Sequence, residues 1–348
     1  MIDSIKFMTT HFSINDYGIF LNEKGNKVSK EELDCGNLNL HLKPMDDGIY
    51  RPKVNLVCDY YGTRQLYVEF SAPKLLYGNN LSELNESDYA DVVTRLVLVL
   101  EDLGIKIFRK DVENAITKKL HLSKNFILPE NSICADAINI FKTAKFPHMK
   151  LEEIEKDKCI KFYSDGLSIV IYDKIEEMEL HNSFDEFSEQ VKELPEIKEH
   201  RILRIEVQMK DYSIKSKIVS DILETNGNLK FKEAFNEEVF REIFERILKK
   251  LNETIPDMIL EGNETEELKE LCESPGELSK KFLLISYQKQ QGNYFDGIEK
   301  LKEDYDLKNN FIEANNCILI KDEYFRDLAM KYLKEIQNYK PLNYQFEQ

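Results

Sequence analysis

The sequence predicts an α+β protein, in which an antiparallel-sheet domain over residues 1–213 is followed by a mainly helical domain over residues 214–348. Strand-like runs with alternating apolar residues recur through the first two-thirds of the chain, as in antiparallel sheets. From about residue 214 the apolar residues recur instead at helical spacing. A chain of 348 residues is also long enough for about two domains.

The expected elements of the first domain, in chain order, are a hairpin over 54–70, a helix over 88–104, and strands over 118–128, 165–174 and 200–210. The hairpin has two β-rich runs around Tyr61-Gly62-Thr63. Gly104 ends the helix. An Asp165-Gly166 turn opens the strand over 165–174.

The second domain is predicted from four segments with helical periodicity. They cover residues 236–255, 273–291, 293–305 and 323–339. The acidic stretch 261–273 is interpreted as a solvated helix face or a linker.

Composition places the chain among soluble folded proteins, because it is 42% hydrophobic and 32% charged. No apolar run approaches the ~20 residues of a membrane span, and the N-terminus does not resemble a signal peptide, so a cytoplasmic location is expected. The six cysteines form no C-x-x-C pair, which favours reduced thiols. A net charge of −16 argues against a nucleic-acid partner. Basic residues nevertheless exceed acidic ones over 101–150, so a locally basic surface remains open.

Strand alternation gives each of four predicted strands one apolar face and one polar face. If the strands are neighbours, the polar faces gather Glu69, His121, Tyr172, Lys174, Arg204 and Glu206. A half-solvated antiparallel sheet shows the same alternation without any function. The functional interpretation is a metal and nucleophile site, since two carboxylates and an imidazole suit Mg²⁺ or Mn²⁺. A phenol, with a pKa of ~10, needs a nearby cation before it can act as a nucleophile.

Four ordered blocks resemble a known family, the gene-II-type rolling-circle replication initiators of filamentous phages and related plasmids. The blocks are YVEFSAPKLLYGNN (67–80), AITKKLHLS (115–123), IVIYDKIEEME (169–179) and LRIEVQMKDYSIKS (203–216). The opening Met-Ile-Asp is also similar. The resemblance covers about residues 1–220 and implies a metal-dependent enzyme that nicks and rejoins DNA.

The resemblance assigns roles residue by residue. Tyr172 is similar to the nucleophile that forms a 5′-phosphotyrosine link, and Lys174 to an electrostatic helper. Glu206 and Glu69 match acidic metal positions, and His121 stands where the phage members carry aspartate; the implied cofactor is Mg²⁺ or Mn²⁺.

Four other residues of these blocks are candidate DNA contacts: Lys74, Asn80, Lys119 and Arg204. The implied partner is single-stranded or cruciform origin DNA, with a host helicase as a further candidate and no membrane. Two departures from the family stand out. The strand reads His121-Leu122-Ser123 where related nickases carry two histidines, and Asn79 replaces the histidine of a Gly-His-Asn signature.

Two other functions stay open. A non-catalytic DNA-binding replication regulator would keep the fold but lack metal-dependent cleavage. A protein–protein interaction module would use the acidic surface and would show no salt-dependent binding to single-stranded DNA.

Overall fold

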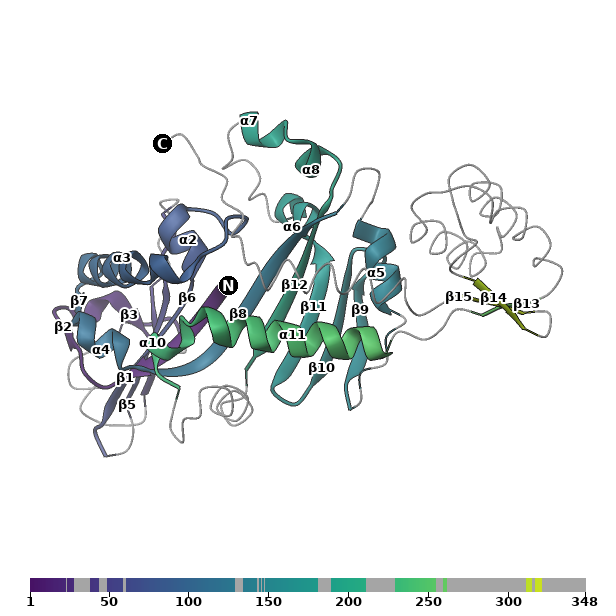
Figure 1. The fold of residues 1–348 in the computed structure, drawn as a ribbon. Helices are drawn as coiled ribbons and strands as arrows, with labels where there is room; N and C mark the ends of the chain where they lie inside the picture. Colours follow the sequence, from purple (N-terminus) through teal and green to yellow (C-terminus); the bar gives the residue numbers. More distant parts are fainter. Residues whose placement is uncertain are drawn as a thin grey trace.

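The computed structural model describes residues 1–22, 24–27, 38–43, 49–58, 61–128, 134–142, 144, 146, 148–180, 189–210, 229–254, 259–261, 311–314 and 317–320. Within these residues, one antiparallel sheet of 10 strands dominates the fold (Figure 1). Its order is β3 (Phe20–Leu21), β4 (Leu38–Leu42), β5 (Lys53–Cys58), β6 (Arg64–Ser71), β1 (Ile2–Thr9), β8 (Ile116–Ile127), β12 (Ile202–Met209), β11 (Leu167–Asp173), β10 (Cys159–Ser164) and β9 (Lys150–Glu155).

Helices and short elements fill the connections between these strands. The helices are α2 (Ala72–Tyr77), α3 (Tyr89–Asp102), α4 (Arg109–Glu113), α5 (Cys134–Lys142), α6 (Lys174–Leu180), α7 (Glu189–Lys192), α8 (Pro195–Lys198), α10 (Phe231–Ala234) and α11 (Glu237–Thr254), with the 3₁₀ turns η1 (Tyr17–Ile19) and η2 (Glu86–Asp88). A small sheet pairs β2 (Ser13–Ile14) with β7 (Ile105–Lys106), and another joins β13 (Ile259–Glu261), β15 (Cys317–Ile320) and β14 (Phe311–Ala314).

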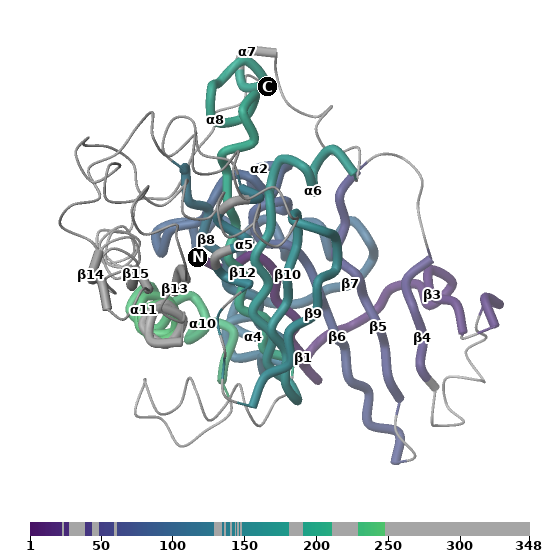
Figure 2. Tube along the Cα trace, turned by 90° about the vertical axis from the view of Figure 1, so that its right-hand side faces the viewer, coloured from purple at the N-terminus to yellow at the C-terminus, as the bar shows by residue number. Residues whose placement is uncertain are grey.

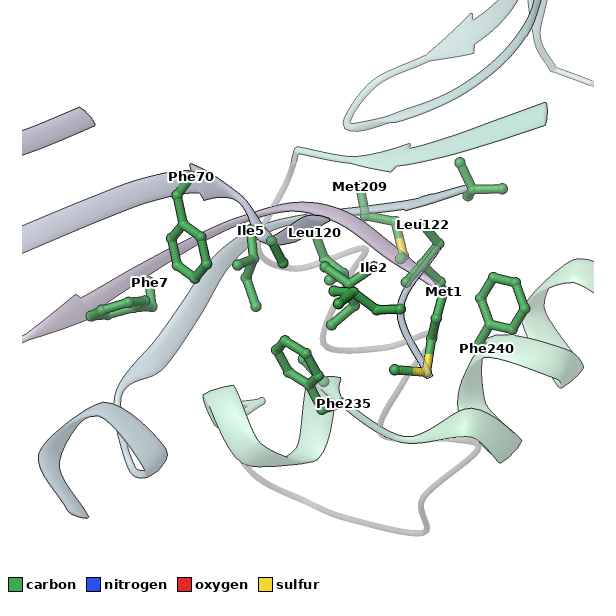
Figure 3. Packing of buried hydrophobic residues seen from close by; sticks show 14 of the residues in the cluster. Met1, Ile2, Ile5, Phe7, Phe70, Leu120, Leu122, Met209, Phe235 and Phe240 are labelled. Carbon is green, nitrogen blue, oxygen red and sulfur yellow. The ribbon is translucent and has the colours of Figure 1, made fainter. Parts of the chain in front are cut away.

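The sheet buries one face because its strands alternate. In β5, in β6 and in β1 from Ser4 onward, buried side chains alternate with more exposed ones. The buried side chains meet apolar residues from α3, α5, α10 and α11 in one cluster. Figure 3 shows part of it, with Leu120 and Leu122 of the sheet above Phe235, which follows α10, and Phe240 of α11. In Figure 1, α11 lies across β8, β12, β11 and β10.

The predicted α+β class with an antiparallel sheet is confirmed. The predicted hairpin, helix and strands correspond to β5 and β6, α3, β8, β11 and β12. One boundary differs. Residue 174 was expected to continue the strand, but β11 ends at Asp173 and Lys174 begins α6. Asp173 Oδ1 accepts hydrogen bonds from the backbone N–H groups of Ile175 and Glu176, as a side chain at a helix start does.

Residues beyond 213 take part in the same core as the sheet. Phe231, Val239, Phe240 and Phe244 are buried in its main cluster. Because these side chains are buried in the core of the sheet, α10 and α11 pack with the sheet, although both helices lie beyond the expected domain boundary at residue 213. The helix expected over 236–255 is α11, whereas those expected over 273–291, 293–305 and 323–339 lie outside the described residues. Among the described helices, none has the length and hydropathy to cross a membrane.

Candidate metal and tyrosine site

The site lies on the polar face of the sheet, where β8, β12 and β11 are consecutive strands. Their register aligns three successive rungs on this face, and every member except Val170 is polar: His121, Gln208 and Ser168; then Ser123, Glu206 and Val170; then Asn125, Arg204 and Tyr172. Since aligned side chains share a face, the strand pairing brings together residues far apart in the chain, such as His121 and Glu206, which are 85 positions apart. The expected gathering of His121, Tyr172 and Glu206 is therefore present in the structure.

Asp3 joins these residues through an irregularity in β1. Regular alternation would put Asp3 on the face of Ile5 and Phe7, which are fully buried in the core. The pairing of β1 with β8 instead shifts register between Ile2 and Ser4, and such a bulge turns a side chain to the other face. Asp3, His121 and Glu206 each offer a ligand atom, and the three atoms lie within 4.8 Å of one another.

The histidine of this group has one nitrogen engaged and one without a partner. His121 Nδ1 lies 2.8 Å from Glu206 Oε1, so Nδ1 carries the proton that the carboxylate accepts. Nε2 is buried and has no hydrogen-bond partner among the described residues. A buried polar atom without a partner costs free energy. An imidazole nitrogen of His121 and the two carboxylates are together donors that fit a divalent cation such as Mg²⁺ or Mn²⁺.

The two carboxylates of the group differ in protonation behaviour. Burial raises the pKa of Asp3, and the negative charge of Glu206 raises it further. Burial also acts to raise the pKa of Glu206, but the hydrogen bond and charge of His121 and the charge of Arg204 outweigh it, so that pKa is lowered. Asp3 is half-buried and Glu206 is buried. Two such carboxylates side by side are costly without compensating positive charge, and a divalent cation would supply it.

Tyr172 faces the same carboxylate from β11. Its hydroxyl donates to Glu206 Oε2 at 3.5 Å. Burial raises the pKa of the phenol well above 10. The charge of Arg204 acts to lower it, and the nearby carboxylates of Glu206, Asp3 and Glu177 act to raise it. The phenol is therefore protonated at neutral pH in this state, and it needs an added positive charge before it can act as a nucleophile.

Arg204 lies beneath the site and is only 1% exposed. Its guanidinium donates to Asn125 Oδ1 at 2.6 Å, to Asp3 Oδ1 at 3.2 Å and to the backbone carbonyl of Asn80. Each of its three nitrogens thus has a partner inside the protein. In this structure Arg204, expected as a DNA contact, holds Asp3 and the chain around Asn80 in place.

Lys174, expected as a helper on the strand face, is fully buried at the first position of α6. Its ammonium donates to Glu177 Oε2 at 2.5 Å. Burial, followed by repulsion from Arg204, lowers the pKa of Lys174 to about 8. Its positive charge also acts to lower the pKa of Asp3.

Glu69, expected as a metal ligand, is not among the three clustered ligands. It lies on the same polar face but nearer the other end of the sheet, where Lys119 Nζ donates to Glu69 Oε1 at 2.5 Å and Lys6 Nζ lies 3.9 Å from Oε2. The hydrogen bond and charge of Lys119 outweigh burial and lower the pKa of Glu69. The third member of the candidate group is Asp3 instead.

The remaining expected DNA contacts are Lys74, Asn80 and Lys119, and each is partly exposed. Lys74 belongs to α2, which Ser71 caps and Gly78 ends with a left-handed backbone. Asn79, which replaces the family histidine, is buried and organises the following loop by accepting hydrogen bonds from the N–H groups of Leu81 and Ser82.

Two groups near the site had no assigned role from sequence. The match of the opening Met-Ile-Asp to the family was the available signal for Asp3, but alternation alone points Asp3 into the core. Glu83 is also buried, and its carboxylate accepts from Lys124 Nζ at 2.8 Å and from the backbone N–H of Asn125 at 2.5 Å. Lys124 therefore lies inside the protein.

A second set of possible ligands, Glu176, Glu179 and His200, lies on α6 and two residues before the start of β12. Glu179 is exposed, and the other two are half-buried.

Scans against protein-family models, curated proteins and solved structures find no match for this chain.

Proposed function

We propose that this protein is a metal-dependent DNA-nicking and joining enzyme of the rolling-circle initiator type, with Tyr172 as its nucleophile. One observation carries the proposal. The Tyr172 hydroxyl lies 3.5 Å from a carboxylate oxygen of Glu206, and Glu206 belongs to a group with Asp3 and His121 that fits a divalent cation. A nucleophile beside a metal site is the arrangement that phosphodiester transfer requires.

In the proposed step, the phenol loses its proton and its oxygen bonds to the phosphorus of a DNA phosphodiester. The bond from phosphorus to the 3′-oxygen breaks, and that oxygen takes up a proton to become a 3′-hydroxyl. The products are a 5′-phosphotyrosine link and a free 3′ end, and the reverse reaction rejoins the strand. Glu206 Oε2 is the acceptor that lies against the phenol proton.

The other residues of the site support this step. Asp3, His121 and Glu206 would hold Mg²⁺ or Mn²⁺, which when bound supplies Lewis-acid polarisation of the phosphoryl oxygens. Lys174 adds a buried positive charge. Arg204 fixes Asp3 through its hydrogen bond.

The test is formation of a covalent protein–DNA adduct. A single-stranded DNA pool of random sequence, labelled at its 3′ ends, is incubated with the full chain and Mn²⁺ or Mg²⁺, then resolved on a denaturing gel. A 3′ label is required because the tyrosine retains the 5′ phosphate of the downstream fragment. Wild type is expected to give a labelled protein band that disappears when EDTA removes the metal. Tyr172→Phe is expected to give no band, because the nucleophilic oxygen is missing.

A matched control is Tyr163→Phe, which removes a hydroxyl from β10 on the same polar face. This variant is expected to keep the adduct. An adduct that persists in Tyr172→Phe would reject the nucleophile, and metal-independent binding with no adduct from any pool would favour the non-catalytic regulator.

A further inference from the structure

A row of lysines crosses the polar face of the sheet next to the site. The register pairs Lys53 with Glu69, Glu69 with Lys6, and Lys6 with Lys119. Lys210 directly follows Met209, which pairs with Leu120, so Lys210 continues the same rung beside Lys119. We call Lys53, Lys6, Lys119 and Lys210 the lysine row. Glu69 is the acidic side chain within it.

The row concentrates positive charge in a chain of net charge −16. Glu69 offsets one charge through its contacts with Lys119 and Lys6, which leaves four ammonium groups against one carboxylate. The register places Lys210 opposite Lys119, and burial, then repulsion from Lys161 and Lys119, lowers the pKa of Lys210. The side chains of Lys6 and Lys119 are 28% and 25% exposed, so solvent reaches them.

The row is one rung away from the candidate metal site. Lys119 precedes His121 by two positions on β8, which corresponds to about 7 Å along a strand. Neighbouring strands are about 4.8 Å apart, so the row extends away from His121 across β8, β1, β6 and β5. A polyanion bound along the lysine row would therefore cross the β-strands nearly at right angles.

The row ends at a pocket. Lys53 is one of its lining residues, together with His41, Lys43, Arg51 and Asn55, and the pocket has a volume of about 440 Å³. Ile49 adds an apolar surface to the lining. Basic groups around a partly apolar hollow suit a nucleotide, which has both a phosphate and a base. Figure 2 shows the strands that carry the pocket, β4 and β5, at the part of the sheet distant from α11.

We propose that single-stranded nucleic acid lies along the lysine row, with its phosphates on Lys119, Lys6 and Lys210 and a distal nucleotide held in the pocket beside Lys53. This inference rests on the proposed function for the site beside the row, and it adds the path of the strand and an anchoring pocket remote from the cleaved bond. Because the lysines form a single row, they can contact the phosphates of one nucleic-acid strand.

The test measures binding without chemistry. All variants carry Tyr172→Phe, EDTA is present, and anisotropy reports the affinity for a fluorescent oligo(dT) of 30 nucleotides across a salt series. The row variant is Lys6→Gln with Lys119→Gln and Lys210→Gln. The control, Lys106→Gln with Lys110→Gln and Lys232→Gln, makes the same charge change at three exposed lysines away from the row. A charge-keeping variant with arginine at all three row positions checks folding.

The row variant is expected to bind at least tenfold more weakly, and its salt slope to fall by about 2, because single-strand slopes are ≈ −0.7 per phosphate contact. The control and the arginine variant should stay within about threefold of the parent. Lys43→Gln with Lys53→Gln tests the pocket and should weaken binding several-fold. Row and control variants with equal affinity would overturn the proposal, as would tighter binding to a duplex of the same length, or no binding by the parent.

Failure of this inference is distinguishable from failure of the proposed function. Wild-type protein that forms the covalent adduct while the row variant binds normally rejects the strand path alone. Row-dependent binding with no adduct from wild type rejects the nicking activity and keeps the path.

Discussion

Replacing Arg204 with methionine tests whether this residue holds the site together or binds DNA. Methionine is similar in length and apolar, so the change removes the charge and its hydrogen bonds while largely keeping the volume. In the structure Arg204 donates to Asn125, Asp3 and the Asn80 carbonyl. The variant would leave these three acceptors without their donor in a region where Arg204 itself is 1% exposed.

Removing one partner of a buried ion pair costs about 3–5 kcal/mol, and we expect this loss in the free energy of unfolding. Urea titration followed by far-UV circular dichroism measures it. The matched control is Arg246→Met in α11. Its side chain is 59% exposed and pairs with Glu242 one turn earlier, so the loss there should stay below about 1 kcal/mol.

A double-mutant cycle connects the loss to Asp3. Asp3→Asn combined with Arg204→Met should destabilise less than the two single changes added together, by about 0.5–3 kcal/mol. Unchanged stability of Arg204→Met together with weakened oligonucleotide binding would refute the reasoning and restore the DNA-contact role expected from sequence.

Three further predictions concern stability. The hydrogen bond with Asp173 raises the pKa of His200, so the stability that protonated His200 contributes is complete below about pH 6.5 and is lost as pH rises through its folded-state pKa. The variant His200→Asn suits the left-handed backbone at this position (φ 50), and it should lower the free energy of unfolding by under about 1 kcal/mol at pH 5.5 and by less at pH 8. Equal losses at the two pH values in urea titrations would contradict this. Phe240→Ala should cost about 3–5 kcal/mol in a single cooperative transition, since Phe240 is 1% exposed within the sheet's own core; a separate early transition would show that α11 folds apart from the sheet. Gly78→Ala should cost about 1–2 kcal/mol in thermal unfolding, because φ is +78 and an added Cβ meets nothing within 4 Å; no loss would reject this backbone conformation.

Sequence pattern was sufficient for the strands that carry the site. Alternation in β6, β8, β11 and β12 predicted which side chains lie on the polar face, because successive side chains of a strand point to opposite faces whatever the neighbouring strands are. Gly104 was likewise expected to follow a helix, and α3 ends at Asp102.

The same rule failed for Asp3 because a bulge depends on the partner strand. Nothing in the spacing of Ile2, Asp3 and Ser4 requires a register shift; the pairing of β1 with β8 produces it. Strand order also separated Glu69 from the site. Glu69 lies on the predicted polar face, but its strand β6 is next to β1. Its carboxylate therefore pairs with Lys6 of β1 and Lys119 of β8.

The sequence by itself determined where strands and helices form and which face of each strand is polar. These features depend on the spacing of apolar and polar residues that are close together in the chain. Only the tertiary structure decided which polar residues meet. The order β1-β8-β12-β11 brings Asp3, His121, Glu206 and Tyr172 together, and burial turned Arg204 from a candidate DNA contact into an internal support. Contacts between residues far apart in the chain depend on sheet order and packing, which no local pattern encodes.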